Sequence, residues 1–129
     1  MKILHVIPIF SPPLLFGGSQ RVVYIISKEL VKRGHEVFIY TSDMKNLKER
    51  TSKFIENVNG ITVVHFKNVS SFLSSRTRLV LTPRMKRILK RELEKFDVIH
   101  VHEARSFQHI VVWWLTRKQT TPYIVQAHG

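Results

Sequence analysis

Short, almost purely apolar runs alternate with amphipathic segments along this chain, and this alternation restricts the folds it can adopt. Strands are predicted over five segments: Lys2–Ile7, Glu36–Tyr40, Ile61–Phe66, Asp97–His102 and Pro122–Gln126. The first, fourth and fifth are nearly continuous apolar runs, which are typical of parallel strands covered on both faces. Strands that alternate with helices favour right-handed crossovers. We therefore predict an α/β fold, a parallel sheet with helices on both faces.

Three amphipathic segments between these strands predict helices. Their expected bounds are Ser19 to Arg33, Pro83 to Phe96 and Ala104 to Lys118. Ser19 suits an N-cap and Gly34 a C-cap of the first helix. The second helix is expected to bury the stripe Met85, Leu89, Leu93 and Phe96. The polar stretch from 43 to 59 is predicted to be a loop with at most a helical turn.

The third helix is expected to have more apolar surface than the domain can cover. Its predicted core face consists of Phe107, Ile110, Val111 and Trp114. Val112 and Trp113 then point the other way. An uncovered apolar patch of this kind marks an interface, so self-association is an expected property.

Composition limits the class of protein further. The 129 residues suit one domain, 43% of them are apolar, and the lack of cysteine excludes disulfides and thiolate chemistry. No apolar run approaches membrane-spanning length and the N-terminus lacks a signal-peptide pattern, so a cytoplasmic location is expected. The net charge of +12 predicts an anionic partner: nucleic acid, a membrane surface or a phosphorylated substrate.

The pair Gly17-Gly18 follows the first strand and a proline-containing loop, and it precedes the first helix. Two glycines let the backbone approach a bulky polar ligand, and the helix N-terminus favours a phosphate. A bare glycine pair is more often an ordinary strand-to-helix turn, so this pair alone does not identify a site.

A glycine pair and several polar residues follow or end predicted strands, and all are expected to meet at one edge of the sheet. They are Gly17, Gly18, His100, His102, Glu103 and His128. In parallel sheets, ligands bind at the carboxyl ends of the strands near the switch in strand order. This convergence predicts a ligand site.

Three segments carry a resemblance to a known family. They are the first strand with its loop through Gly17-Gly18-Ser19-Gln20-Arg21 and residues 30–37, then residues 96–103, and last Val125 to Gly129. In order and spacing they resemble the N-terminal domain of the family-4 retaining glycosyltransferases of GT-B fold. The resemblance implies a Rossmann-like domain over residues 1–129. It also implies transfer of a sugar from a nucleotide-sugar to a sugar or lipid-linked acceptor, with retention and with no metal or other cofactor.

The resemblance also implies roles for individual residues. Gly17 and Gly18 match the glycine loop that faces the donor phosphates, and Gln20 and Arg21 follow it toward the acceptor. His128 matches the active-site histidine beside the transferred sugar, which makes it the catalytic candidate. His102 and Glu103 are expected to line the acceptor cleft.

The family's second domain, which holds most of the nucleotide-sugar, has no counterpart in these 129 residues. We therefore expect a truncated, acceptor-side half of a glycosyltransferase that has no or only trace activity by itself. A truncated gene, a fragment of a longer protein and one part of a split enzyme all fit the sequence, and the candidate partners are a separate donor domain or a second copy of the chain.

The sequence has part of the pattern for two other kinds of site, a dinucleotide site and a zinc site. A dinucleotide site needs a G-x-G-x-x-G turn and an acidic residue after the second strand, but the chain offers only Gly17-Gly18 and Asp43. His100 and His102 share one face of their strand and could bind zinc. Because no third ligand is evident, no metal is expected; His100 is expected to be buried and His5 to be a core or surface residue.

The second helix concentrates positive charge. Its candidate contacts to an anionic membrane are Arg84, Lys86, Arg87, Lys90 and Arg91. Such a run is often a solvated helix face, and membrane binding would place the protein peripherally on the inner face of the membrane. The alternative is a nucleic-acid- or nucleotide-binding module without catalysis, which is disfavoured because no nucleic-acid motif accompanies the charge.

Overall fold

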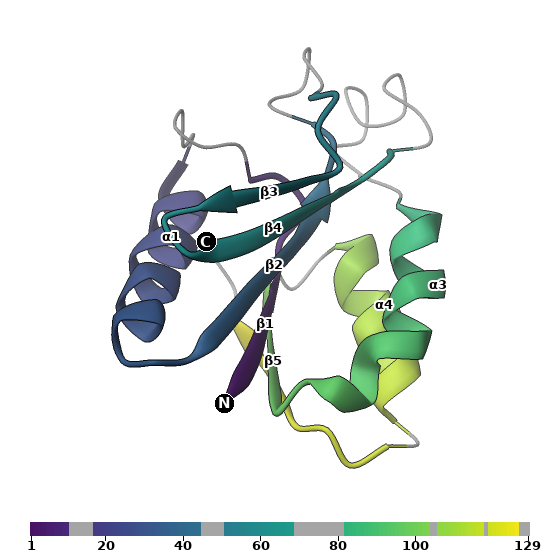
Figure 1. Ribbon diagram of the computed structural model, residues 1–129. Helices are drawn as coiled ribbons and strands as arrows, with labels where there is room; N and C mark the ends of the chain where they lie inside the picture. The colour runs from purple at the N-terminus through teal and green to yellow at the C-terminus, as the bar shows by residue number, and fades with distance from the viewer. Residues whose placement is uncertain (11–16, 45–50, 69–81, 104–105, 118, 127–129) are drawn as a thin grey trace.

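Figure 1 shows the protein as a computed structural model, a central sheet between helices. The structure describes residues 1–10, 17–44, 51–68, 82–103, 106–117 and 119–126. In chain order the elements are β1 (Lys2–Val6), α1 (Gly17–Lys32), β2 (Glu36–Ser42), β3 (Ile55–Val58), β4 (Ile61–Phe66), α3 (Pro83–Glu92), the 3₁₀ helix η1 (Leu93–Lys95), β5 (Val98–His102), α4 (Phe107–Thr116) and β6 (Tyr123–Gln126). The predicted α/β class is confirmed.

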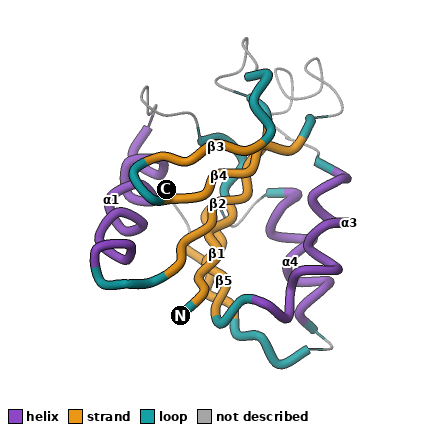
Figure 2. Tube along the Cα trace, in the orientation of Figure 1, coloured by secondary structure: helices purple, strands orange, loops and turns teal. Residues whose placement is uncertain are grey.

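The sheet has the strand order β3-β4-β2-β1-β5-β6. All neighbours from β4 to β6 are parallel, whereas β3 pairs antiparallel with β4 at one edge. The chain builds the sheet on one side of β1 and then crosses to β5 and β6 on the other side. The strand order therefore reverses between β1 and β5, and Figure 2 shows these strands side by side at the centre of the fold.

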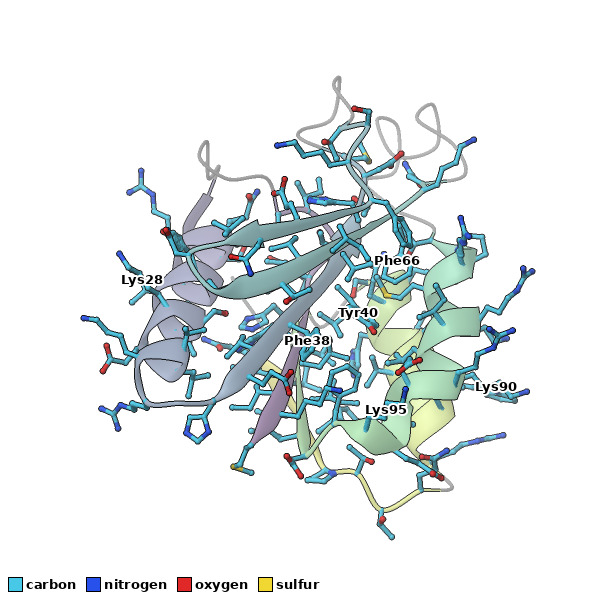
Figure 3. The ribbon with its side chains drawn as sticks, viewed as in Figure 1. Lys28, Phe38, Tyr40, Phe66, Lys90 and Lys95 are labelled. Atoms are coloured by element: carbon cyan, nitrogen blue, oxygen red, sulfur yellow. The ribbon has the colours of Figure 1, made fainter. Side chains whose placement is uncertain are left out.

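Helices cover both faces of the sheet, as predicted. α1 lies on one face over a core that includes Val23, Val37, Ile39 and Val63. α3 and α4 lie on the other face, over the larger core that contains Leu4, Val6 and Val101. Figure 3 shows Phe38, Tyr40 and Phe66 between the sheet and α3. The predicted buried stripe is confirmed, since Met85, Leu89, Leu93 and Phe96 are all buried. The helix ends earlier than predicted, at Glu92, so Leu93 lies in η1 and Phe96 follows it.

The prediction of a loop from 43 to 59 was wrong at β3. Ile55–Val58 pairs with β4 through a tight turn at Asn59 and Gly60, whose φ angles of 52° and 87° are both positive. Asn-Gly is the preferred pair for such a hairpin turn. The Asn57 side chain also accepts a hydrogen bond of 3.0 Å from the Gly60 backbone N–H. The all-parallel sheet is thus corrected to a mostly parallel one.

The ends of α1 agree only in part with the prediction. The helix begins at Gly17, so Ser19 lies inside its first turn and is not the N-cap. Its C-terminus is the predicted glycine cap: Gly34 has φ of +88°, and the His35 N–H donates to the Leu30 carbonyl at 3.1 Å. This bond and the one from Gly34 N–H to the Val31 carbonyl form a Schellman motif.

α4 differs from its prediction in both start and orientation. It begins at Phe107, because Ser106 caps it by accepting a hydrogen bond from the His109 N–H at 3.1 Å. Its buried residues are Gln108, Val111, Val112 and Thr116. Ile110, Trp113 and Trp114 are exposed, so an uncovered apolar patch exists. The predicted core face was wrong at Ile110 and Trp114, which are exposed, and at Val112, which is buried.

Candidate functional site

The carboxyl ends of the parallel strands form the edge at which a ligand site is expected. Figure 1 shows that α1, α3 and α4 all begin near this edge and run back along the sheet. Each N-terminus presents backbone N–H groups and the positive end of a helix dipole. The edge therefore suits an anionic ligand, above all at the reversal of strand order between β1 and β5.

Gly17 and Gly18 form the first residues of α1 at this edge. Among the residues that the structure describes, a Cβ added at Gly18 would meet no atom within 4 Å, and Gly18 does not have a positive φ. Neither local packing nor backbone conformation therefore demands glycine at this position. The open space is what a ligand that approaches the first turn of the helix would need.

The two residues expected next to the acceptor differ in exposure. Gln20 is buried, on the side of α1 that also carries the buried Val23 and Ser27. Arg21 is exposed. Of the pair, Arg21 is the side chain presented to solvent, and the acceptor contact expected of both residues stays a prediction.

Glu103 follows β5 directly and lies at the expected edge. Its φ of 72° is unusual for a residue with a side chain, and its backbone N–H donates to the Gln126 carbonyl at 3.1 Å. Backbone strain of this kind is concentrated at functional sites, where the surrounding structure holds it in place. The half-buried carboxylate of Glu103 is accordingly the best-placed acidic group at the end of β5.

The structure brings His100 and His102 together with His5, which the sequence had not linked to them. His5 and His100 are paired across β1 and β5, and the Nδ1 atom of His5 lies 3.1 Å from Nε2 of His102. The rings of His100 and His102 stack with their centroids 4.0 Å apart. One nitrogen from each of the three imidazoles falls within 4.8 Å of the others.

Burial in this cluster reverses the expectation. His102 is fully buried and so does not line an open cleft, while His100 is half-buried. His5 is buried too, and burial, with a smaller effect of the neighbouring His100, lowers its pKa to about 3. A buried imidazole avoids the charged form because the charge would lose its hydration. His5 is therefore neutral at neutral pH.

His5 is the residue that sequence reasoning missed. It was expected only to fill the core or surface, and the missing information was the partner strand of β1. Once β1 and β5 are paired in parallel, the alternation of side chains places His5, His100 and His102 on one face. The one signal in the sequence was histidine on two nearly continuous apolar strands.

Asp43 stands where a dinucleotide site would need its acidic residue, at the carboxyl end of β2. Its carboxylate accepts a hydrogen bond of 3.0 Å from the Asn68 backbone N–H. Its own backbone N–H donates to the Phe66 carbonyl at 2.8 Å. Asp43 thus ties the chain after β4 to the end of β2, and this structural task weakens the dinucleotide alternative.

The basic surface of α3 is present as predicted. All five candidate contacts are exposed: Arg84, Lys86, Arg87, Lys90 and Arg91. Figure 3 shows Lys90 pointing away from the sheet, opposite to Lys28 on α1. None of the helices in the described ranges has both the length and the apolar character needed to cross a bilayer.

The catalytic candidate His128 lies outside the described residues, and its role stays a prediction.

A hollow elsewhere on the molecule is not part of the candidate site. It has a volume of about 450 Å³ and is lined by Glu94, Gln119, Thr120 and Thr121. These residues precede β5 and β6, so the hollow lies at the amino edge of the sheet, away from the candidate site.

Comparison with known protein families finds one that matches most of the chain. Residues 16–129 match the family described as Glycosyltransferase Family 4. The matched range begins just before Gly17 and includes all of β5, Glu103 and the last strand. A search of curated proteins found no match to the chain.

Proposed function

This chain belongs to glycosyltransferase family 4 as an N-terminal, Rossmann-like domain, and on that premise we propose that it forms the acceptor side of a sugar-transferring enzyme. The donor is a nucleotide-sugar, the acceptor is a sugar or a lipid-linked sugar, and the anomeric configuration is retained. A second domain supplies most of the donor contacts.

The observation that carries this proposal is the open first turn of α1. The space beside Gly18 leaves the backbone N–H groups of the turn accessible to a diphosphate. Arg21, one turn further along the same helix, adds a positive charge that can contact a polar or phosphorylated acceptor. Glu103, at the end of β5, adds a carboxylate that can accept a hydrogen bond from a sugar hydroxyl.

His128 completes the proposed site by its position in the family's motif. A histidine beside the transferred sugar can donate a hydrogen bond to a hydroxyl or to the leaving group. One such bond to a charged group contributes about 1.5–3 kcal/mol, so His128→Ala should lower turnover by roughly tenfold to a hundredfold.

The test is reconstitution. The purified chain is assayed with a panel of nucleotide-sugars and acceptors, alone and mixed with the donor domain of a family-4 enzyme. We expect no or only trace turnover alone, because the leaving diphosphate needs donors and charge that the second domain supplies. We expect turnover in the mixture, with retention visible in the anomeric signals of the product by NMR.

Variants assign the activity to the proposed site. Arg21→Ala should lower turnover in the mixture, whereas Lys28→Ala, on the exposed side of the same helix, should not. Robust turnover by the chain alone would refute the division into halves. An inverted product, or equal effects of the two variants, would refute the proposed chemistry or the proposed acceptor contact.

A second candidate function is binding to an anionic membrane, and the exposed basic face of α3 favours it. Each basic side chain near an anionic leaflet contributes about 1 kcal/mol, and salt weakens the attraction. A lipid-linked acceptor would be reached from such a surface.

A matched pair of double variants tests the membrane proposal. Lys86→Glu with Lys90→Glu reverses two charges one turn apart on α3, and Lys28→Glu with Lys32→Glu does the same on α1. We expect sedimentation with anionic but not neutral vesicles, and its loss in the α3 variant only. Equal loss in both variants, or tighter binding to DNA or RNA than to vesicles, would reject it.

A further inference from the structure

We propose that His5, His100 and His102 form a binding site for a divalent transition-metal ion of the zinc class. The three imidazoles come from the two neighbouring central strands, and one nitrogen of each lies within 4.8 Å of the others. This site is separate from the sugar-transfer chemistry, for which family resemblance implies no metal, and it is anchored in the rigid centre of the sheet.

The distances approach those of a tetrahedral site. Zinc binds histidine nitrogen at about 2.0–2.1 Å, so two ligand nitrogens are about 3.3 Å apart. The 3.1 Å between Nδ1 of His5 and Nε2 of His102 is already close to that value. The remaining nitrogen separations are no more than 4.8 Å, so closure of the site around an ion requires the third imidazole to rotate about its side-chain bonds.

The chemistry of the ligands also fits. Metals bind imidazole through the lone pair of a ring nitrogen, and this cluster brings three such rings together. Imidazole suits zinc, copper and nickel, whereas calcium and magnesium prefer oxygen ligands that this cluster lacks. Three protein ligands leave one position, and half-buried His100 marks the side on which water can fill it.

A purely structural role leaves one atom unexplained. Nε2 of His5 is buried and makes no hydrogen bond among the described residues. A buried polar atom without a partner is costly, and an apolar side chain would fill the same space among the surrounding apolar strands more cheaply. A metal ion bound by Nδ1, the nitrogen that faces His102, would leave Nε2 as the buried N–H of the neutral ring, and metal binding gives a reason to keep histidine here despite that cost.

Co²⁺ and Zn²⁺ are the probes for this site. The chain, purified without a polyhistidine tag and stripped with chelator, is titrated with Co²⁺ while its visible absorption is recorded, and Zn²⁺ is then added as a competitor. We expect one Co²⁺ per chain, the strong absorption of a four-coordinate ion, displacement by Zn²⁺ and a higher melting temperature with either ion.

Variants locate the ion. His100→Gln, at a half-buried position, is expected to fold and to weaken Co²⁺ binding by more than roughly a hundredfold, the loss that outer-shell partners alone can cause. His5→Phe should do the same. His35→Gln and His109→Gln change histidines outside the cluster and should leave binding unaltered.

Several results would overturn the proposal. They are the absence of stoichiometric binding at micromolar Co²⁺, an octahedral spectrum, or equal losses in the His100 and His109 variants. If His5→Phe does not fold, ring NMR signals of the wild-type chain decide the matter, because Zn²⁺ must shift the signals of the three clustered histidines and leave those of His35 and His109 in place.

Discussion

The sheet face under α3 and α4 buries a different kind of side chain from the face under α1. On the α3–α4 face, Tyr40 packs edge-on against Phe66 with ring centroids 5.1 Å apart, and Phe38 against Phe96 at 5.5 Å. On the α1 face, the core beneath the helix is mostly aliphatic with Phe10 as its buried aromatic ring, and β1 and β5 carry the three histidines. The first arrangement stabilises the fold, and the second holds the metal site that we propose.

This contrast teaches where function can be placed in a small α/β domain. Aromatic and aliphatic burial on one face stabilises the fold by many kcal/mol in total. Polar groups can then be buried on the other face, at the strands nearest the reversal of order, without loss of the fold. Four predictions test this division.

The largest expected effect is on the aromatic face. Phe66→Ala removes a fully buried ring and leaves a cavity, which should lower the free energy of unfolding by about 3–5 kcal/mol. Denaturant unfolding followed by circular dichroism measures it. A loss below about 1 kcal/mol would mean that this face is not the main source of stability.

Acid should lower the free energy of unfolding through His5, which lies on the α1 face of the sheet. The pKa of His5 is about 3 in the folded chain and 6.5 in the unfolded chain, so between these pH values His5 binds a proton in the unfolded chain but not in the folded one. Stability then falls as pH falls from 6.5 to 3, by up to about 1.4 kcal/mol per pH unit.

The comparison variant for this effect is His5→Phe, with chelator present in all samples. Its stability should depend less on pH over the same interval, because its residue 5 binds no proton. Because His5 contacts His100 and His102, the difference between the two proteins measures the contribution of His5 together with its coupling to these two residues. Identical pH profiles would show that His5 is not held neutral by the fold.

Two glycines, Gly18 in the first turn of α1 and Gly60 in the turn between β3 and β4, should respond differently to alanine. Gly60 has φ of +87°, and an added Cβ would lie 2.9 Å from Cγ1 of Val31, so Gly60→Ala should cost about 1–3 kcal/mol. Gly18→Ala meets open space within a helix and should change stability by less than about 1 kcal/mol. Thermal melts compare them.

The same pair separates stability from function. In the reconstituted enzyme, Gly18→Ala should lower turnover despite its normal melting curve, since the methyl group occupies space proposed for the donor phosphates. A fully active Gly18→Ala variant would mean that this space is not used.

The smallest effect on stability is expected on the outer side of α4. Trp113 and Trp114 are each 49% exposed, so changing both to Gln should alter the free energy of unfolding by less than about 1 kcal/mol. Binding of a hydrophobic dye and concentration-dependent association should both decrease. Sedimentation that is independent of concentration in the wild-type chain would contradict an interface here.

Local patterns predicted most of the fold, and long-range pairing accounts for what they missed. The apolar runs predicted five strands, and Gly34 and Pro83 marked the end of α1 and the start of α3 near their observed places. β3 was missed because its four residues are mostly exposed, which leaves a weak pattern, although Asn59-Gly60 signalled the hairpin.

The orientation of α4 could not be predicted from apolar periodicity alone. Gln108 is buried because its side-chain amide donates to the Thr82 hydroxyl at 3.0 Å. Trp114 stays at the surface, where the Arg117 guanidinium lies 3.8 Å from its ring centroid. Both contacts involve polar partners, which a pattern of apolar residues does not reveal. The contacts of His5 were hidden for a related reason, because they join residues almost a hundred positions apart in the chain.

The antiparallel hairpin at β3 gives the sheet two unlike margins. At the β3 margin the strand is short and none of its four residues is buried. Glu56 forms an ion pair with Lys53, with side-chain atoms 3.5 Å apart, and charged side chains at a sheet edge disfavour the addition of another strand. At the other margin, β6 exposes Ile124 and Val125 on opposite faces and pairs with β5 alone among the described strands. Lateral growth of the sheet is therefore directional. Any added strand, whether from a companion domain or from another copy in an aggregate, is expected at β6.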